Sequence, residues 1–404
     1  MKYIVMLGDG MADTPVEQLG NKTPLEVAKK PNIDRLAQKG VLGMVKTVPD
    51  SLKPGSDVAN LAVMGFNPLE CYSGRSPLEA VSMGIQMEET DIAFRCNLVT
   101  LSDEADYKDK TMVDYSSQEI TTKEADELIK AVDQAFRTEI IAFYSGISYR
   151  HCMIWKEGPI GLNLTPPHDI SDRKITQYLP QNELVHNLME KSYEVLKDHP
   201  VNLARIERGL RPANSIWLWG EGTKPKVFNF EEHYGVKASV ISAVDLIKGI
   251  GISAGMKVLE VEGATGNEHT NFTGKCQAAY DTLMEGQDFV YIHVEAPDEC
   301  GHRGDVENKV YSIEMIDEKI VGPLVEQLNQ SGEPYSILVL PDHPTPLALK
   351  THTSDPVPFL LYRSNCEKEN EGASYTEAAA EATGICLMEG YKLMGMFLSG
   401  SELK

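Results

Sequence analysis

The chain has 404 residues, a formal net charge of −22 and 42% hydrophobic residues. This length exceeds what one hydrophobic core usually organises, so we expect two domains. The negative charge argues against nucleic acid or an anionic membrane surface as a partner. No apolar run approaches the roughly 20 residues that span a membrane, and Met1-Lys2 leads into an apolar run without a leader pattern. A cytoplasmic protein is therefore predicted.

The cysteines bear on whether the chain has disulfides or a structural zinc site. The chain has seven cysteines, an odd number, and no C-x-x-C pair. This pattern argues against a disulfide framework and against a structural zinc site. Cys300 is interpreted as a packing residue.

The first predicted elements alternate between strand and helix. The apolar run at residues 3–7 predicts a buried strand, and residues 23–28 and 32–37 have helical spacing. Gly40 closes the second of these helices. Apolar residues recur at helical intervals after Ser56, so a helix is expected to begin there.

The middle of the chain predicts an inserted domain. Strands are expected at residues 92–99 and 148–155, and helices at 121–135 and 184–196. No candidate metal ligand falls in this region. We therefore expect a smaller α/β cap domain at residues 91–221, joined to the rest of the chain by two crossings that act as hinges.

The remaining residues, 1–90 and 222–404, are expected to form the core domain. It would have an α/β fold with a largely parallel sheet flanked by helices. Its later predicted elements are strands at 238–241, 289–294 and 337–340, and helices at 277–284 and 313–328. The helix between the last two strands predicts a right-handed crossover and a parallel pair.

Carboxylates and imidazoles follow several of these predicted strands. Asp9 follows the first strand, Asp298 and His302 follow the strand at 289–294, and Asp342 and His343 follow the strand at 337–340. Ligands of open α/β sheets bind at the carboxyl ends of strands. His352 precedes another apolar run.

These residue types suit two divalent cations and a serine nucleophile. Carboxylate oxygen and imidazole nitrogen favour zinc or manganese, while magnesium and cobalt remain open. One ion would take Asp298, His302 and His352, and the other would take Asp9, Asp342, His343 and the hydroxyl of Ser56. A metal-bound hydroxyl has a lowered pKa and attacks phosphorus near neutral pH. The pattern predicts phosphoryl transfer through phosphoserine.

Each residue also has an ordinary structural interpretation. Asp9 alone is typical of a turn or helix cap, Ser56 alone is typical of a helix N-cap, and a single histidine such as His352 is more often a surface or core residue. Three strand ends with carboxylates, two of which also have histidines, favour the metal site over coincidence.

The chain resembles a known family at these residues. The segments 4–13 and 351–359, together with Ser56, Asp298-x-x-x-His302 and Asp342-His343, look like the alkaline phosphatase superfamily. Within it they resemble the cofactor-independent phosphoglycerate mutases of the shorter archaeal type, over nearly the whole chain. Some members of this branch are proposed to be homoserine kinases.

The resemblance implies an alkaline-phosphatase-like core with an inserted substrate-binding cap. In the resembling mutases, comparable cap segments hold glycerate and assist proton transfer, which makes Arg150, His151, Asp169 and Arg211 candidates. Lys248 resembles a lysine near the transferred phosphate. Arg173 lies in the same polar loop as Asp169, and Arg205 and Arg208 precede Arg211 at three-residue spacing. Arginine forks bind phosphate and carboxylate, yet each arginine is equally compatible with a solvated surface position.

The predicted reaction interconverts 3-phosphoglycerate and 2-phosphoglycerate without 2,3-bisphosphoglycerate. Ser56 would take the phosphoryl group, glycerate would reorient under a closed cap that excludes water, and the other hydroxyl would take the group back. Asp169 would act as general base or acid, and His151 would orient the hydroxyls.

Three alternatives remain. A homoserine kinase lacks support from any P-loop or kinase glycine loop; Gly263-Ala264-Thr265-Gly266 reads equally as a tight turn. However, Ser56 could take phosphate from ATP without such a loop. A phosphomonoesterase would be favoured by an open cap. A non-catalytic binding protein would be expected to lose a ligand position, and none is lost. The sequence does not indicate an oligomeric state.

Overall fold

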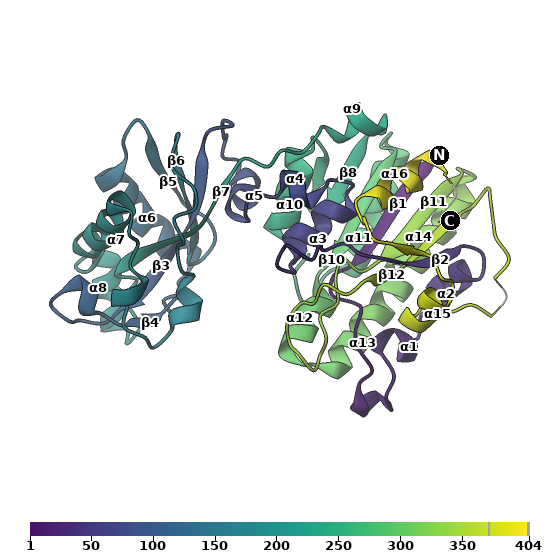
Figure 1. The fold of residues 1–404 in the computed structure, drawn as a ribbon, viewed down its shortest axis with the longest axis horizontal. Coiled ribbons are helices and arrows are strands. Elements are labelled where there is room, and N and C mark those ends of the chain that lie inside the picture. Colours follow the sequence, from purple (N-terminus) through teal and green to yellow (C-terminus); the bar gives the residue numbers. More distant parts are fainter. Residues whose placement is uncertain (371, 402–404) are drawn as a thin grey trace. The chain divides into compact units, whose positions relative to one another are not determined.

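The computed structural model describes residues 1–370 and 372–401. The chain divides into two compact units (Figure 1). The larger unit contains Met1–Tyr72 and the residues from Lys226 onward, and the smaller unit is Ser73–Pro225. The smaller unit thus begins earlier than the sequence boundary at residue 91, because α5 (Ser76–Ser82) packs on two of its strands.

The larger unit is built on an eight-stranded sheet, in the order β13-β2-β12-β11-β1-β10-β8-β9. The strands β9, β8, β10, β1 and β11 are mutually parallel, whereas β12 is antiparallel to both of its neighbours. The bounds are β1 (Lys2–Gly8), β2 (Val41–Val45), β8 (Ala238–Ile241), β9 (Lys257–Leu259), β10 (Phe289–Val294), β11 (Tyr335–Leu340), β12 (Val357–Arg363) and β13 (Cys386–Leu387).

The predicted pairing of the strands at 289–294 and 337–340 is wrong. These strands, β10 and β11, are parallel, but each pairs with β1, which lies between them. Every residue of β10 and β11 is buried. Continuous apolar runs of this kind are typical of central parallel strands that are covered on both faces, and the alternation of residues along the chain does not reveal which strand lies between two others.

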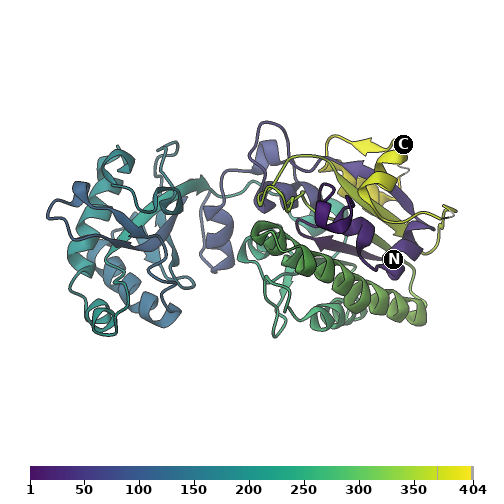
Figure 2. The same ribbon diagram turned by 90° about the horizontal axis from the view of Figure 1, so that it is seen from below.

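Helices flank this sheet. On one face, Ile4, Met6 and Val290 pack against α11, α13 and α14 in a continuous hydrophobic core, and Figure 2 shows the green helices of residues 306–331 as a nearly continuous rod along the sheet. The helices of the unit are α1 (Pro24–Val27), α2 (Pro31–Ala37), α3 (Ser56–Val63), α4 (Pro68–Cys71), α9 (Phe230–Tyr234), α10 (Asp245–Ser253), α11 (Phe272–Met284), α12 (Ala296–Arg303), α13 (Val306–Met315), α14 (Gly322–Ser331), α15 (Glu377–Ala382) and α16 (Lys392–Ser399), with a 3₁₀ turn at Glu17–Leu19 and a π-helical segment at Ile316–Val321.

The smaller unit is an antiparallel sheet with helices. The central strand β3 pairs with β6, β7 and, at its C-terminal end, β4, and β6 pairs with β5. Its strands are β3 (Ile92–Leu101), β4 (Met112–Asp114), β5 (Ile141–Tyr144), β6 (Arg150–Trp155) and β7 (Ser215–Thr223). Besides α5, its helices are α6 (Thr122–Phe136), α7 (Glu183–Leu196) and α8 (Pro200–Glu207), with 3₁₀ turns at Tyr107–Asp109, Pro167–Ile170 and Thr176–Tyr178.

Local sequence explains why the helices of this unit form. Thr121 caps α6 through the backbone N–H of Glu124, and Asn182 caps α7 in the same way. Along α6, Ala125, Leu128 and Val132 are buried at helical spacing. This apolar stripe packs in one core with alternate residues of β3, so the helix covers one face of the sheet. The fold class expected from the sequence is confirmed.

Candidate functional site

The candidate site lies at the carboxyl ends of three parallel strands of the larger unit. Asp9 follows β1, and Asp342 and His343 follow β11 after one residue. Asp298 lies in the first turn of α12, directly after β10, rather than at the strand end itself. Since β1 lies between β10 and β11, all three chain segments reach the same edge of the sheet, where α/β proteins bind ligands.

One group of ligand atoms comes from Asp9, Asp342 and His343, whose side chains are at most 1% exposed. Nε2 of His343 lies 3.6 Å from Oδ1 of Asp9 and 3.4 Å from Oδ2 of Asp342. The two carboxylates therefore face one imidazole nitrogen. Oxygen and nitrogen donors in this arrangement can hold a divalent cation.

A second group surrounds Asp298. Nε2 of His302 lies 3.3 Å from Oδ2 of Asp298, and Nε2 of His352 lies 3.4 Å from Oδ1. The two imidazole Nε2 atoms are 2.8 Å apart. Asp298 and His302 are four residues apart on α12, so they project from the same face of the helix. The ligand atoms of Asp298, His343 and His352 also lie within 4.8 Å of one another, so His343 borders both groups.

The buried carboxylates fit a bound cation. Oδ1 of Asp9 is buried and has no hydrogen-bond partner among the described residues, which is costly for a carboxylate oxygen unless a cation or proton meets it. Burial, together with the nearby carboxylates of Asp342, Asp298 and Glu295, raises the pKa of Asp9 well above its usual value. A divalent cation at this place would offset that repulsion.

The charge of Asp298 is stabilised differently. Burial alone would raise its pKa, but hydrogen bonds with His302 and His352 hold the pKa of Asp298 well below its usual value. The bond to Asp298 in turn raises the pKa of His302 to about 9. Without a cation, the protonated imidazole of His302 thus supplies the positive charge beside Asp298.

Ser56 is the first residue of α3, as the sequence predicted. Its Oγ lies 3.1 Å from Nε2 of His343, which places the hydroxyl beside the group of Asp9, Asp342 and His343. The N-terminus of a helix favours negative charge. The structure therefore brings together Ser56 and all six candidate ligands.

Asn60 fixes this arrangement and was missed by sequence reasoning. Its Nδ2 donates to the backbone oxygen of Ser56 at 2.9 Å and to Oδ2 of Asp342 at 2.7 Å. Its Oδ1 accepts from the hydroxyl of Tyr291 at 2.6 Å. Asn60 lies four residues after Ser56 on the predicted helix, so the two residues share a face. This spacing could have identified Asn60 from the sequence.

His293 is a second missed residue. It lies in β10 with its side chain fully buried, and its Nε2 is 2.9 Å from Oδ2 of Asp9. Its Nδ1 is 3.1 Å from the hydroxyl of Ser242. Hydrogen bonds of this kind orient metal ligands. A histidine within an otherwise apolar strand was the signal in the sequence.

Gly10 is required for the close packing of the loop after β1. Its φ angle is +61°, and a Cβ atom there would lie 2.7 Å from Cα of Asp298. Its N–H donates to Oδ1 of Asp342 at 3.1 Å. Only glycine combines this conformation with this approach.

Lys248 and most candidates of the smaller unit contact other protein residues. Lys248 binds Glu260 at 2.8 Å, Arg211 binds Asp114 at 2.9 Å, and Arg208 and Arg205 both bind Glu124. Arg173 is exposed and donates to the hydroxyl of Tyr178. Asp169 is exposed beside His168. Acidic partners account structurally for four of these cations, Lys248, Arg205, Arg208 and Arg211.

His151 and Arg150, both expected from the sequence to contact substrate, do not share a face of the sheet. Successive residues of a strand point to opposite faces, and these two are the first residues of β6. Arg150 lines a cavity, whereas His151 is 5% exposed, accepts from the N–H of Gly146 at Nδ1, and has no partner at Nε2. Burial lowers the pKa of His151 to about 3.

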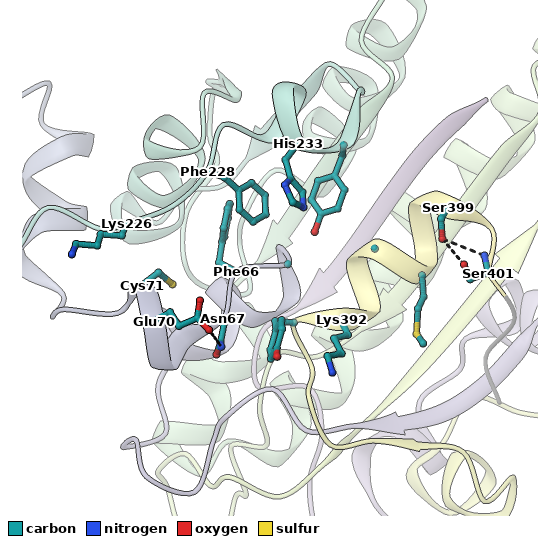
Figure 3. Close-up of a pocket in the computed structure, with 15 residues that line it drawn as sticks. Phe66, Asn67, Glu70, Cys71, Lys226, Phe228, His233, Lys392, Ser399 and Ser401 are labelled. Carbon is teal, nitrogen blue, oxygen red and sulfur yellow. Dashed lines mark hydrogen bonds between the residues drawn. The ribbon is translucent and has the colours of Figure 1, made fainter.

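A separate cavity of about 490 Å³ lies in the larger unit (Figure 3). Its wall includes Phe66, Phe228 and His233; the rings of Phe228 and His233 stack at 3.9 Å, and those of Phe66 and Phe228 are 4.6 Å apart. Neither Ser56 nor any candidate metal ligand lines this cavity. We therefore assign no part of the reaction to it.

Comparisons with known proteins identify the family. A family model described as 2,3-bisphosphoglycerate-independent phosphoglycerate mutase matches residues 37–202. A probable 2,3-bisphosphoglycerate-independent phosphoglycerate mutase of Geobacter sulfurreducens is 48% identical over 98% of this chain and 100% of its own length. The corresponding mutase of Methanosarcina mazei is also 48% identical, over 98% of this chain and 100% of its own. The chain belongs to the family of 2,3-bisphosphoglycerate-independent phosphoglycerate mutases.

Solved structures share the fold of this chain. A protein from Pyrococcus horikoshii has a TM-score of 0.82 at 28% identity, over 99% of this chain and 98% of that one. The cofactor-independent phosphoglycerate mutase of Thermoplasma acidophilum has a TM-score of 0.65 at 24% identity, over 99% of both chains, and shows that the fold is shared. The family resemblance seen in the sequence is confirmed. Among the described residues, no helix is long and apolar enough to cross a membrane.

Proposed function

We propose that this protein interconverts 3-phosphoglycerate and 2-phosphoglycerate through a phosphoserine at Ser56. The observation that carries the proposal is the hydroxyl of Ser56, which lies 3.1 Å from His343 at the N-terminus of α3 and beside a cluster of buried carboxylates and imidazoles. The relatives named as phosphoglycerate mutases, which match the chain over its length, support the same substrate.

Two divalent cations are part of the proposal. Asp9, Asp342, His343 and Ser56 would hold one, and Asp298, His302 and His352 would hold the other, with His343 at the border of the two groups. When bound, the cations would lower the pKa of the serine hydroxyl and offset the charge of the transferring group. Manganese or zinc suits these donors, and magnesium or cobalt is also compatible.

The chain's own residues supply the rest of the reaction. Ser56 Oγ loses its proton and forms a bond to phosphorus while the bond from phosphorus to the glycerate oxygen breaks, and that oxygen takes up a proton. In the second half, the other glycerate hydroxyl loses its proton and its oxygen forms a bond to phosphorus, while the bond from phosphorus to Ser56 Oγ breaks and Oγ takes up a proton. We propose Asp169, in the exposed turn Pro167–Ile170, as the group that exchanges these protons. His151 is buried on the opposite face of β6 from Arg150, so we do not propose a catalytic role for it.

We further propose that the smaller unit binds the organic-acid part of the substrate and that the larger unit carries the metals and Ser56. The substrate is a small phosphorylated acid, 2,3-bisphosphoglycerate is not needed, and the protein acts in the cytoplasm. These statements extend the family assignment to this chain.

An enolase-coupled assay tests the proposal. It measures formation of 2-phosphoglycerate from 3-phosphoglycerate with added manganese and without 2,3-bisphosphoglycerate. Parallel reactions contain ATP with homoserine, or measure release of inorganic phosphate. The proposal predicts metal-dependent conversion that a chelator suppresses. If product formed only from ATP and homoserine, the proposed substrate would be wrong. If the protein only released inorganic phosphate, the proposed reaction would be wrong.

A further inference from the structure

Two polar side chains, those of Tyr291 and His293, point to the same face of β10. The residues that alternate with them, Val290 and Ile292, pack on the other face in the hydrophobic core of the larger unit. Tyr291 and His293 are both fully buried. A buried hydroxyl in an apolar strand requires a hydrogen-bond partner. For Tyr291 this partner is a side chain of the candidate site, Asn60.

The buried amide of Asn60 uses all of its hydrogen-bonding groups. Its Oδ1 accepts from the hydroxyl of Tyr291 at 2.6 Å. Its Nδ2 donates to the backbone oxygen of Ser56 at 2.9 Å and to Oδ2 of Asp342 at 2.7 Å. An amide side chain offers one acceptor oxygen and two N–H groups. Since Asn60 is 0% exposed, the loss of one partner leaves a group that water does not reach.

These partners determine which way the amide of Asn60 points. A flipped amide would place Oδ1 against the carbonyl oxygen of Ser56 and the carboxylate of Asp342, and all of these atoms are acceptors. Burial and the carboxylates of Asp342 and Asp9 raise the pKa of Tyr291 well above its usual value. The phenol therefore keeps its proton and remains a donor. Its hydroxyl stabilises the orientation in which Nδ2 faces the site.

The carboxylate of Asp342 is held from two sides. Its Oδ1 accepts from the backbone N–H of Gly10 at 3.1 Å and from that of His343 at 2.9 Å. Its Oδ2 accepts from Asn60 and lies 3.4 Å from Nε2 of His343. Asn60 thus orients the carboxylate oxygen beside the candidate ligand His343. The same amide also holds Ser56, the first residue of α3.

We infer that Tyr291 is a positioning residue, which acts through the amide of Asn60 on both Ser56 and Asp342. The inference rests on the proposed function, which makes Ser56 the nucleophile and Asp342 a metal ligand. Removal of a hydrogen-bond partner of a metal ligand typically lowers metal affinity or activity by about 10- to 100-fold. The hydroxyl of Tyr291 lies one hydrogen bond further from the ligand, so its removal should act at the lower end of this range.

Kinetics and manganese titration of the full-length protein test the inference. Tyr291→Phe removes only the hydroxyl, and Asn60→Ala removes the amide. Steady-state kcat and KM for 3-phosphoglycerate are measured for the wild type, each single variant and the double variant. The Kd for manganese is measured on the same four proteins by calorimetry.

The matched control is Tyr335→Phe. Tyr335 is 1% exposed and donates to Oδ1 of Asn329 at 3.0 Å. It is the first residue of β11, at the opposite end of this strand from the candidate site. The control therefore removes an equivalent buried hydrogen bond, from a tyrosine to an asparagine, without touching Ser56 or Asp342.

The inference predicts that kcat of Tyr291→Phe falls by about tenfold and that the Kd for manganese rises. KM should change less than kcat, because the buried hydroxyl does not contact substrate. If Tyr291 acts through Asn60, adding Tyr291→Phe to Asn60→Ala should change neither quantity further, so the two effects should not be additive. Tyr335→Phe should behave as the wild type.

Unchanged kcat and unchanged manganese affinity in Tyr291→Phe would overturn the inference, as would additive losses in the double variant or an equal loss in Tyr335→Phe. If Asn60→Ala does not fold, the comparison of Tyr291→Phe with Tyr335→Phe decides the outcome. Failure of the proposed function is distinguishable. Absence of conversion in the wild type would overturn that function, while the manganese titrations would still decide whether Tyr291 positions Asp342.

Discussion

The hydroxyl oxygen of Ser56 lies 3.1 Å from Nε2 of His343, although 287 positions separate the two residues in the chain. Asn60 holds this relationship, because it binds both the backbone of Ser56 and the carboxylate of Asp342. The start of α3 and the end of β11 are thereby joined, and the proposed nucleophile is placed beside the proposed metal ligands.

Substitution of this serine should separate metal binding from catalysis. Ser56→Ala removes the proposed nucleophile but leaves Asp9, Asp342 and His343, so we expect phosphoryl transfer to fall by at least about a thousandfold, as when other covalent nucleophiles are removed. Bound metal, measured by elemental analysis, should remain. Substantial turnover by the variant would remove Ser56 from this role.

Divalent cations should stabilise the fold through Asp9. Its buried Oδ1 lacks a partner and its pKa is raised by burial and neighbouring carboxylates, so a cation that binds only the folded state should raise Tm. At a free concentration of 100 times Kd, the expected gain in free energy of unfolding is about 2.7 kcal/mol. Thermal unfolding with manganese or zinc, before and after chelation, measures it.

The matched variant for this experiment is Asp9→Asn, which keeps the size of the side chain but removes its charge. We expect a smaller shift of Tm on addition of the cation, because one of the anionic ligands is lost. An equal shift in both proteins would show that the cation binds without Asp9.

Lys309 and Asp13 form a buried ion pair that supports the loops of the site. Nζ of Lys309 lies 2.7 Å from Oδ2 of Asp13, both side chains are fully buried, and Nζ also donates to the backbone oxygen of Thr345. Lys309→Met leaves the carboxylate of Asp13 buried without its cation. A loss of about 3–5 kcal/mol in the free energy of unfolding is expected, measured by urea denaturation.

The exposed Lys319, which pairs with Glu318, offers the control for that substitution. Lys319→Met should change the free energy of unfolding by no more than about 0.5 kcal/mol. Comparable losses in the two variants would argue that the buried pair has no special role.

His151 should make stability depend on pH. Burial lowers its pKa from 6.5 to about 3 in the folded state, so between these values the unfolded chain binds more protons than the folded one. The free energy of unfolding therefore rises with pH across this window and falls as the solution is acidified. His151→Asn should show a shallower decline from pH 7 to pH 4 in denaturant titrations. Identical slopes for the variant and the wild type would contradict the assignment.

The metal-ligand candidates could be predicted because their chemistry is local. Asp342-His343 and Asp298-x-x-x-His302 each join carboxylate and imidazole within one turn or loop, and apolar runs mark the strands that precede them. Parallel strands bring such segments to one edge of a sheet whatever their separation in sequence. The order of the strands was not predictable in this way, since nothing in β10 or β11 shows that β1 lies between them.

The groups of the smaller unit were harder to predict because their partners are distant in sequence. Arg208 and Arg211 meet Glu124 and Asp114 from other elements, which spacing along the chain does not reveal. Arg95 and Arg150 line one cavity, which depends on the pairing of β3 with β6 and β7 across the sheet. The alternation of β6 did contain the information that Arg150 and His151 face opposite ways.

The most direct test of the phosphoserine mechanism is to locate the transferred phosphoryl group on the protein. The metal-loaded enzyme is incubated with 3-phosphoglycerate that carries a labelled phosphate, quenched in acid and digested, and the peptides are sequenced by mass spectrometry. The mechanism predicts label on Ser56, lost on addition of D-glycerate as labelled 2- and 3-phosphoglycerate form. Conversion of 3-phosphoglycerate without any label on Ser56, or with label on another residue, would contradict it.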